Sequence, residues 1–301
     1  MEITFLANFQ GEIAALTAAL IWAIASFVYV HLGKQFPPTL LNLFKNSIAI
    51  LLIGITLLLM GNGIPTLDPL AVGLLAISGA VGIGFGDTVF FEALNCLGSR
   101  RALLMESLAP PLTALLAIAF LQETLANTDY LGIGLTITGV AWVVVERAPD
   151  AVQRYLRPLR GIAFGGMAAL AQASGAVMSR AALVETDISP LWSSLIRLSA
   201  GVVLLLLWVG LKPQLHQEFP KLRSGKMLLV LTGSAFFSTF LAIWLQQISL
   251  KYAEAGVAQS LSATSPLFVI PIALLLGERV SLRALLGAAI ALIGIWLLFA
   301  S

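Results

Sequence analysis

The chain alternates between long apolar runs and short polar connections. Runs of about twenty residues are bounded by Gly, Pro and charged positions. A helix of about 20 residues crosses a hydrocarbon layer of about 30 Å, and a backbone surrounded by lipid must satisfy its own hydrogen bonds, which favours helix. The pattern therefore predicts ten membrane-spanning helices, over residues 11–31, 39–60, 70–94, 102–121, 128–146, 160–182, 189–210, 226–249, 256–276 and 281–299.

The second half of the chain repeats the first. Residues 102–123 and 257–278 each consist of a polar first half, a proline and an apolar second half that ends at a glutamate. Twelve positions separate Pro111 from Glu123, and twelve separate Pro266 from Glu278. Internal self-similarity of this kind indicates a repeat architecture.

We therefore expect two five-helix repeats, over residues 11–146 and 160–301. Because five crossings are an odd number, the second repeat enters the membrane upside down relative to the first. Inverted repeats are a recurring plan of secondary transporters, which bind substrate near the midplane between the two copies. The predicted fold class is an all-α integral membrane protein of ten transmembrane helices in two inverted repeats.

The composition agrees with a membrane protein and excludes several other classes. Hydrophobic residues make up 59% of the chain and charged residues 11%, against roughly 25% charged in soluble proteins. No basic cluster suggests nucleic acid. The single cysteine excludes internal disulfides and cysteine-based metal sites, and both histidines lie in or next to predicted loops. We expect no cofactor and no metal, and no cleaved signal peptide, because residues 1–12 carry no Lys or Arg.

The distribution of Lys and Arg predicts the orientation. Thirteen of them fall in the loops after the first, third, fifth, seventh and ninth predicted helices, and two fall on the side of the termini. The positive-inside rule then puts the long middle loop in the cytoplasm and both termini outside. We expect a multi-pass protein of the cell (inner) membrane.

Two cations lie inside predicted helices at the same place in each repeat, Lys45 and Arg197. A charged side chain in hydrocarbon is costly, so each needs a function or a partner. They could face a central cavity and bind an anionic group such as a substrate carboxylate. They could instead pair with neighbouring acids or extend toward the interface.

The acids near these cations are not repeated. Asp87 and Glu92 correspond to Ala242 and Gln247 in the second half. A carboxyl group inside a membrane has a raised pKa and can exchange a proton near neutrality, which makes both acids candidates for proton coupling. The alternative is that they only neutralise nearby cations such as Lys45.

Polar and aromatic side chains on shared helix faces could line a solute pathway. Such groups also bond packed helices to one another or form ordinary packing surface, and both interpretations stay open. The two repeated prolines each free a backbone carbonyl one turn earlier. The two repeated glutamates are expected to fix the short turns that follow them, a structural role. The candidate substrate-contacting residues of this group are Trp22, Gln172, Ser107, Gln259, Ser262, Trp244 and Gln247.

The repeated motif carries a family resemblance. The series Pro111, Glu123, Gly132 and Gly139, its copy in the second half, and the segment Phe91-Glu92-Ala93-Leu94 resemble the EamA repeat of the drug/metabolite transporter superfamily. The resemblance covers essentially the whole chain. It implies a ten-helix secondary transporter with a central cavity, often an exporter of amino acids or other small metabolites. Members of this family are expected to keep both termini in the cytoplasm, and Glu92 stands where aromatic or neutral residues are common.

We therefore expect a secondary active transporter, an exporter of small metabolites such as amino acids, that works by alternating access. A passive facilitator or channel is the alternative, and it would need a continuous ring of like groups. A membrane-embedded enzyme is less favoured, because no nucleophile with a base is evident in a span. The expected partners are a small-molecule substrate, the lipid bilayer and, as a candidate, protons; both a monomer and a homodimer remain open.

Overall fold

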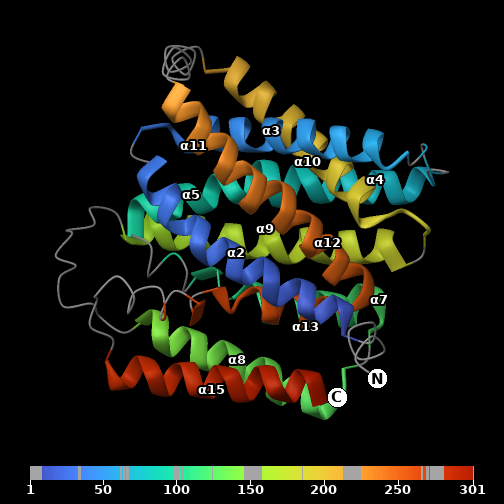
Figure 1. The fold of residues 1–301 in the computed structure, drawn as a ribbon. Helices are drawn as coiled ribbons and strands as arrows, with labels where there is room; N and C mark the ends of the chain where they lie inside the picture. Colours follow the sequence, from blue (N-terminus) through green and yellow to red (C-terminus); the bar gives the residue numbers. More distant parts are fainter. Residues whose placement is uncertain are drawn as a thin grey trace.

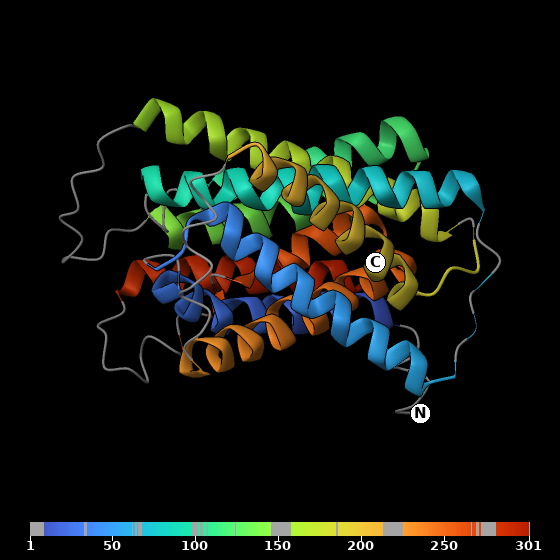
Figure 2. The same ribbon diagram turned by 90° about the horizontal axis from the view of Figure 1, so that it is seen from above.

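The computed structural model describes most of the chain, and within the described ranges every regular element is a helix. These ranges are residues 9–32, 35–61, 63, 65, 68–97, 102, 105–106, 108–123, 125–145, 158–184, 186–212, 225–265, 267–268, 271 and 281–300. The helices run roughly along one common direction (Figures 1 and 2).

The helices of the first repeat agree closely with the apolar runs, and α4, η1 and α5 form one continuous rod. They are α2 (Gln10–Leu32), α3 (Pro38–Leu59), α4 (Pro69–Ser78), the π-helical η1 (Gly79–Gly86), α5 (Asp87–Leu97), α7 (Ala109–Leu121) and α8 (Asn127–Val145).

The second repeat has the same order, and α11, η3 and α12 again form one rod. Its helices are α9 (Pro158–Val184), α10 (Pro190–Gly210), α11 (Gly225–Ala235), the π-helical η3 (Phe236–Leu241), α12 (Ala242–Tyr252), α13 (Ala255–Ser262) and α15 (Leu282–Ala300).

Local sequence determines where several of these helices begin. Proline is the first residue of α3, α4, α9 and α10, where its missing N–H leaves no intrahelical bond unmade. The Asp68 side chain caps α4 by accepting from Ala71 N at 2.9 Å, and Ser189 caps α10 by accepting from Trp192 N at 3.3 Å. These signals lie in the sequence itself, so the predicted starts are accurate to one or two residues.

Five of the described helical rods are long and apolar enough to cross a membrane: Pro38–Leu59, Pro69–Cys96, Leu159–Val184, Pro190–Gly210 and Gly225–Tyr252. Three shorter apolar helical stretches, Gln10–Ala25, Ala109–Leu121 and Leu285–Leu297, accompany them. Large apolar side chains such as Leu58 and Leu59 point out of the bundle, as expected for a surface in contact with lipid. The chain is a multi-pass membrane protein, and the count of ten crossings stays a prediction.

The two repeats pack against each other in matched pairs. Helix α2 contacts α12, and its counterpart α9 contacts α5; α3 contacts η3, and its counterpart α10 contacts η1. Figure 1 shows that counterparts run in opposite directions, with α2 running from right to left and α9 from left to right. This is the arrangement that an inverted repeat produces.

The repeated glycines bring α8 and α15 together at one edge of the bundle (Figure 1). A Cβ atom added at Gly139 would lie 2.5 Å from the Gly287 carbonyl oxygen. A Cβ added at Gly294 would lie 2.7 Å from the Gly132 carbonyl oxygen. The four positions are related by the repeat, so the same small residues make the contact from both sides.

Helix α7 differs from the predicted span of 102–121. It begins at Ala109, so Pro110 and Pro111 occupy its first turn and not its middle. Proline is tolerated there because the first N–H groups of a helix have no intrahelical partner. The expectation that Pro111 frees a carbonyl within a continuous helix is therefore corrected. In the second repeat, α13 ends at Ser262, close to the equivalent place.

We predict that Gly139→Ala lowers the apparent Tm by several degrees, because the new methyl group overlaps backbone atoms of α15. Gly134→Ala in the same helix is the control, since nothing lies within 4 Å of the added Cβ there. Thermal unfolding of the purified protein in detergent measures both. Equal Tm values for the two variants would contradict the close α8–α15 contact.

The orientation is tested by Arg154→Cys in a Cys96→Ser background. The positive-inside rule predicts that a membrane-impermeant maleimide labels position 154 only after the cytoplasmic face is made accessible. Labelling of intact cells from the outside would reverse the predicted orientation.

Candidate functional site

Two π-helical segments lie at equivalent places in the repeats, η1 before α5 and η3 before α12. Each has a main-chain carbonyl that accepts a hydrogen bond from a side chain of another helix. Asn42 Nδ2 donates to Ile83 O at 2.9 Å, and Trp22 Nε1 donates to Ser238 O at 2.9 Å. Ile83 and Ser238 are counterparts, 155 residues apart. Segments of this kind are frequent at functional sites, and the sequence analysis did not detect them.

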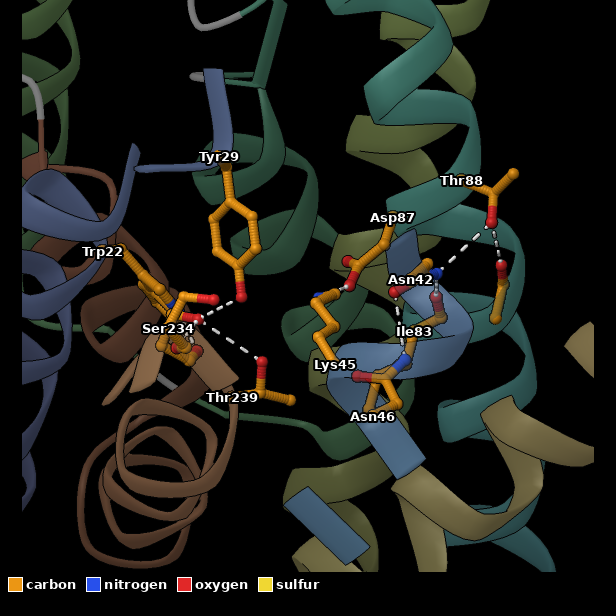
Figure 3. Close-up of polar contacts among 12 residues, drawn as sticks. Trp22, Tyr29, Asn42, Lys45, Asn46, Ile83, Asp87, Thr88, Ser234 and Thr239 are labelled. Atoms are coloured by element: carbon orange, nitrogen blue, oxygen red, sulfur yellow. Dashed lines mark hydrogen bonds and ion pairs between the residues drawn. The ribbon is translucent and has the colours of Figure 1, made fainter. Parts of the chain in front are cut away.

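Lys45 and Asp87 form an ion pair next to η1 (Figure 3). Lys45 Nζ lies 2.7 Å from Asp87 Oδ2, and the lysine is only 7% exposed. The ammonium group also lies 5.8 Å from the centre of the Phe91 ring, a distance suited to a cation–π contact. The sequence left two interpretations of Lys45 open. In the structure, Lys45 pairs with a neighbouring acid.

Two asparagine amides of α3 lie next to this ion pair (Figure 3). Asn42 Nδ2 also lies 3.3 Å from Thr88 Oγ1, and Asn46 Nδ2 donates to Asn42 Oδ1 at 3.0 Å. Both asparagines are fully buried in α3. Asn42 thereby joins α3 to η1 and α5, and Asn46 bonds to the Asn42 amide from within α3 (Figure 3).

Arg197 is in a different state, although it is the counterpart of Lys45. It is 2% exposed, and its Nε and Nη1 atoms have no hydrogen-bond partner among the described residues. The reason lies in the sequence, because the position equivalent to Asp87 is Ala242 in the second repeat. An unpaired guanidinium in a low-dielectric interior is unfavourable, so an anion that reached it would be strongly attracted.

Glycines make the space that Arg197 occupies. A Cβ atom at Gly82 in η1 would lie 3.4 Å from Arg197 Nη2, and one at Gly175 in α9 would lie 3.6 Å from the same atom. Gln172 from α9 reaches the same place, its Oε1 lying 3.6 Å from the Cβ that Gly82 lacks. The guanidinium therefore lies where α10, η1 and α9 meet, between the two repeats. Asp87 acts on Arg197 only electrostatically.

Hydroxyl groups and aromatic rings of α2 and η3 face the Lys45–Asp87 pair across the bundle (Figure 3). The Tyr29 and Ser238 hydroxyl oxygens are 2.5 Å apart, and Ser238 Oγ donates to Ser234 O at 2.7 Å. Trp22 belongs to this group through its bond to Ser238. The predicted residue Trp22 thus belongs to the group of side chains that faces the Lys45–Asp87 pair (Figure 3).

Trp244 and Gln247 connect α12 to its neighbours. Trp244 packs against the core cluster that includes Phe240, with ring centres 6.0 Å apart. Gln247 Oε1 accepts from Ser193 Oγ at 2.6 Å, while Gln247 Nε2 has no partner among the described residues. Both contacts are of the packing type that the sequence analysis left open.

Glu92 is partly buried in α5 and takes part in neither of the ion pairs of the described residues.

Gln259 and Ser262 are buried in α13. Ser265 Oγ donates to Ser262 O at 3.1 Å, which is the carbonyl four residues before Pro266. That carbonyl cannot receive a bond from proline, so a hydroxyl group meets the freed acceptor, as the sequence allowed. Ser262 Oγ itself has no partner among the described residues. Ser107, Pro266 and Glu278 lie outside the described residues.

Glu123 has a wider role than the turn that was expected for it. Its Oε1 accepts from Arg180 Nε at 2.8 Å, and its Oε2 accepts from Ala255 N at 3.1 Å. It therefore connects the end of α7 to α9 and α13 in the second repeat. Sequence spacing could not reveal these partners, because they are distant along the chain.

A cavity of about 270 Å³ lies beside α15, away from the buried charges. Apolar side chains dominate its wall, which consists of Thr264, Leu267, Phe268, Pro271, Ala288, Leu292 and Ile295. Because it contains neither Lys45 nor Arg197, it is not the predicted central cavity. A central cavity at the charges stays a proposal.

The matched pairs of counter-running helices, with ionisable groups buried between them, are features of inverted-repeat membrane transport proteins. The model of the EamA-like transporter family matches residues 9–145 and 159–300. The chain therefore belongs to the EamA-like transporter family, and the resemblance predicted from the repeated motif is confirmed.

Comparison with curated proteins gave no match. Among solved structures, a crystal structure described only as that of a protein is similar over 97% of this chain and 98% of its own, with a TM-score of 0.77 and 17% sequence identity. At this identity the likeness shows the fold alone.

We predict that Asp87→Asn lowers the apparent Tm by several degrees. It would leave Lys45 buried without a counter-charge, and breaking one side of a buried pair costs roughly 3–5 kcal/mol. The double variant Lys45→Met/Asp87→Asn should recover most of the loss, because both charges are then absent. Thermal unfolding in detergent compares the three proteins. An unchanged Tm for Asp87→Asn alone would show that the pair does not stabilise the fold.

Proposed function

We propose that this chain is a secondary active transporter that exports small metabolites, such as amino acids, across the cell (inner) membrane. Membership of a transporter family supports transport, and the pairing of counter-running repeats supports alternating access between them. Burial of ionisable groups where the repeats meet supports a binding site there.

The observation that carries the proposal is the buried guanidinium of Arg197, whose Nε and Nη1 atoms have no hydrogen-bond partner among the described residues. Each of these N–H groups can donate a charge-assisted hydrogen bond to an anionic group. Lys45 already has a carboxylate at 2.7 Å. In this scheme Arg197 binds an anionic group of the solute, and Lys45 does so only if Asp87 releases it.

Asp87 is the residue that would link solute binding to protons. Protonation would neutralise it and free Lys45, changing the net charge of the site by one. Glu92, on the same helix, is a second candidate for this role. The remaining predicted contacts are proposed to complete the pathway: Trp22, Gln172, Ser107, Gln259, Ser262, Trp244 and Gln247.

We predict that Arg197→Gln reduces uptake of an anionic or zwitterionic solute by about tenfold or more, because hydrogen bonds to a charged group are worth roughly 1.5–3 kcal/mol. The solute would be chosen by screening labelled amino acids and carboxylic acids in counterflow with proteoliposomes. Lys212→Gln is the matched control, since Lys212 follows the end of α10 and contacts the Trp208 ring.

Equal uptake by Arg197→Gln and the unaltered protein would reject Arg197 as the anion-binding group. Flux that rises linearly with solute concentration and shows no exchange would favour the alternative, a passive facilitator or channel. An imposed pH gradient tests coupling. If Asp87→Asn and Glu92→Gln both keep gradient-driven uptake, neither acid carries the proton.

A further inference from the structure

A second buried ion pair lies far from the central charges, between Glu123 and Arg180. The Glu123 and Arg180 side chains are 12% and 14% exposed, and Arg180 Nε lies 2.8 Å from Glu123 Oε1. Glu123 follows α7 in the first repeat, whereas Arg180 is in the last turns of α9 in the second. The bond therefore crosses from one repeat to the other.

The same two side chains bind two further helix ends. Arg180 Nη1 lies 3.1 Å from Leu250 O and 2.9 Å from Lys251 O, at the end of α12. Glu123 Oε2 accepts from the N–H of Ala255, the first residue of α13, where a carboxylate is favoured by the helix dipole. Four helix ends are joined by one ion pair.

These contacts lie at the end of the bundle where α2 begins and α15 ends (Figure 1). A cluster of buried, mostly small apolar side chains packs beneath them. This cluster consists of Ala117, Ala176, Val177, Leu183, Leu250, Ala253, Ala255 and Ala258.

The sequence does not repeat this ion pair. The repeat relates Ala18 to Ala168 and therefore Val30 to Arg180. Valine has no charge, so the repeat does not provide the same cation for Glu278, the copy of Glu123.

Arg180 is the cation that offsets the mutual repulsion of several nearby carboxylates. Burial, together with the negative charges of Glu123 and Asp129, raises the pKa of Glu254 above its usual range, and Arg180 acts in the opposite direction. Removing the arginine would leave these carboxylates facing one another. Their repulsion would favour separation of the helix ends.

We propose that Glu123 and Arg180 are gating residues, whose ion pair holds the terminal end of the bundle closed and leaves the binding residues to open toward the opposite end at rest. This inference rests on the alternating access of the proposed function, because solute release at the terminal end then requires the bonds between the repeats to break. With the orientation predicted from Lys and Arg, the resting transporter loads solute from the cytoplasm, as export requires.

The test measures access to the cluster beneath the pair and needs no solute. Ala176→Cys is placed in a Cys96→Ser background, and the full chain in lipid nanodiscs reacts with a water-soluble maleimide. Adding Arg180→Gln should raise the labelling rate about tenfold or more, which corresponds to about 1.4 kcal/mol of opening free energy. Glu123→Gln breaks the charge pair from the other side and keeps an acceptor for Ala255 N, so it should raise the rate less.

Lys251→Gln is the matched control. It also removes a cation at this end, but Lys251 Nζ donates to Ile188 O within the second repeat, at 2.9 Å. Labelling should therefore stay at the basal rate. The exchanged variant Glu123→Arg/Arg180→Glu should restore part of the protection, because it recovers the pair and not the bonds to the backbone.

An unchanged labelling rate in both single variants would overturn the gate, and so would an equal increase in Lys251→Gln. If Arg180→Gln does not fold, Glu123→Gln and the exchanged variant decide between the same outcomes. The labelling result is independent of the transport result. If Arg180→Gln labels faster while Arg197→Gln transports normally, the anion site is rejected and the gate is kept.

Discussion

A charge buried inside a membrane protein is costly without a counter-charge, and the two repeats differ in whether they supply one. Lys45 has Asp87 at 2.7 Å. Arg197, its counterpart, has Ala242 where the acid would be. The cation of the first repeat is therefore paired, while its counterpart in the second repeat has no ion-pair partner among the described residues. The difference follows from the acid at position 87, which the second repeat replaces by alanine.

The helical rods that pack against α3 and α10 are irregular where they contact them. Segments η1 and η3 interrupt the α-helical bonding in both repeats, and side chains from α3 and α2 bond to their carbonyls. Glycine completes the contact, since a Cβ at Gly79 would overlap the main chain of Arg197. In a π-helix, residues five apart lie about one turn from each other, so Gly79 and Gly84 are on the same face of η1. Gly79 lies against Arg197 of α10, and a Cβ at Gly84 would lie 3.2 Å from the Gly201 carbonyl oxygen of the same helix. Close main-chain packing, and not side-chain size, determines where Arg197 lies.

The proposed alternating access would need contacts between the repeats that can break, and the buried polar contacts are suited to this. Apolar packing is non-directional and tolerates small shifts, whereas an ion pair or a capped helix end is either made or lost. The Glu123–Arg180 pair joins the repeats at one end of the bundle, and the charges around Arg197 lie between the repeats near its middle. In the proposed mechanism, anion binding at Arg197 and opening of the terminal end would be coupled through movement of α9, which contributes residues to both places.

The sequence alone determined the membrane class, the duplication and most helix bounds, such as 39–60 for a helix that spans 38–59. Hydropathy, proline and repeat spacing are local properties, so they can be read without coordinates. It also identified Lys45 and Arg197 as buried cations. Only the tertiary structure decided that the first is paired and the second is not, and that Glu123 binds α9 and α13. Those outcomes depend on how helices distant in sequence are rotated and packed, which no local pattern encodes.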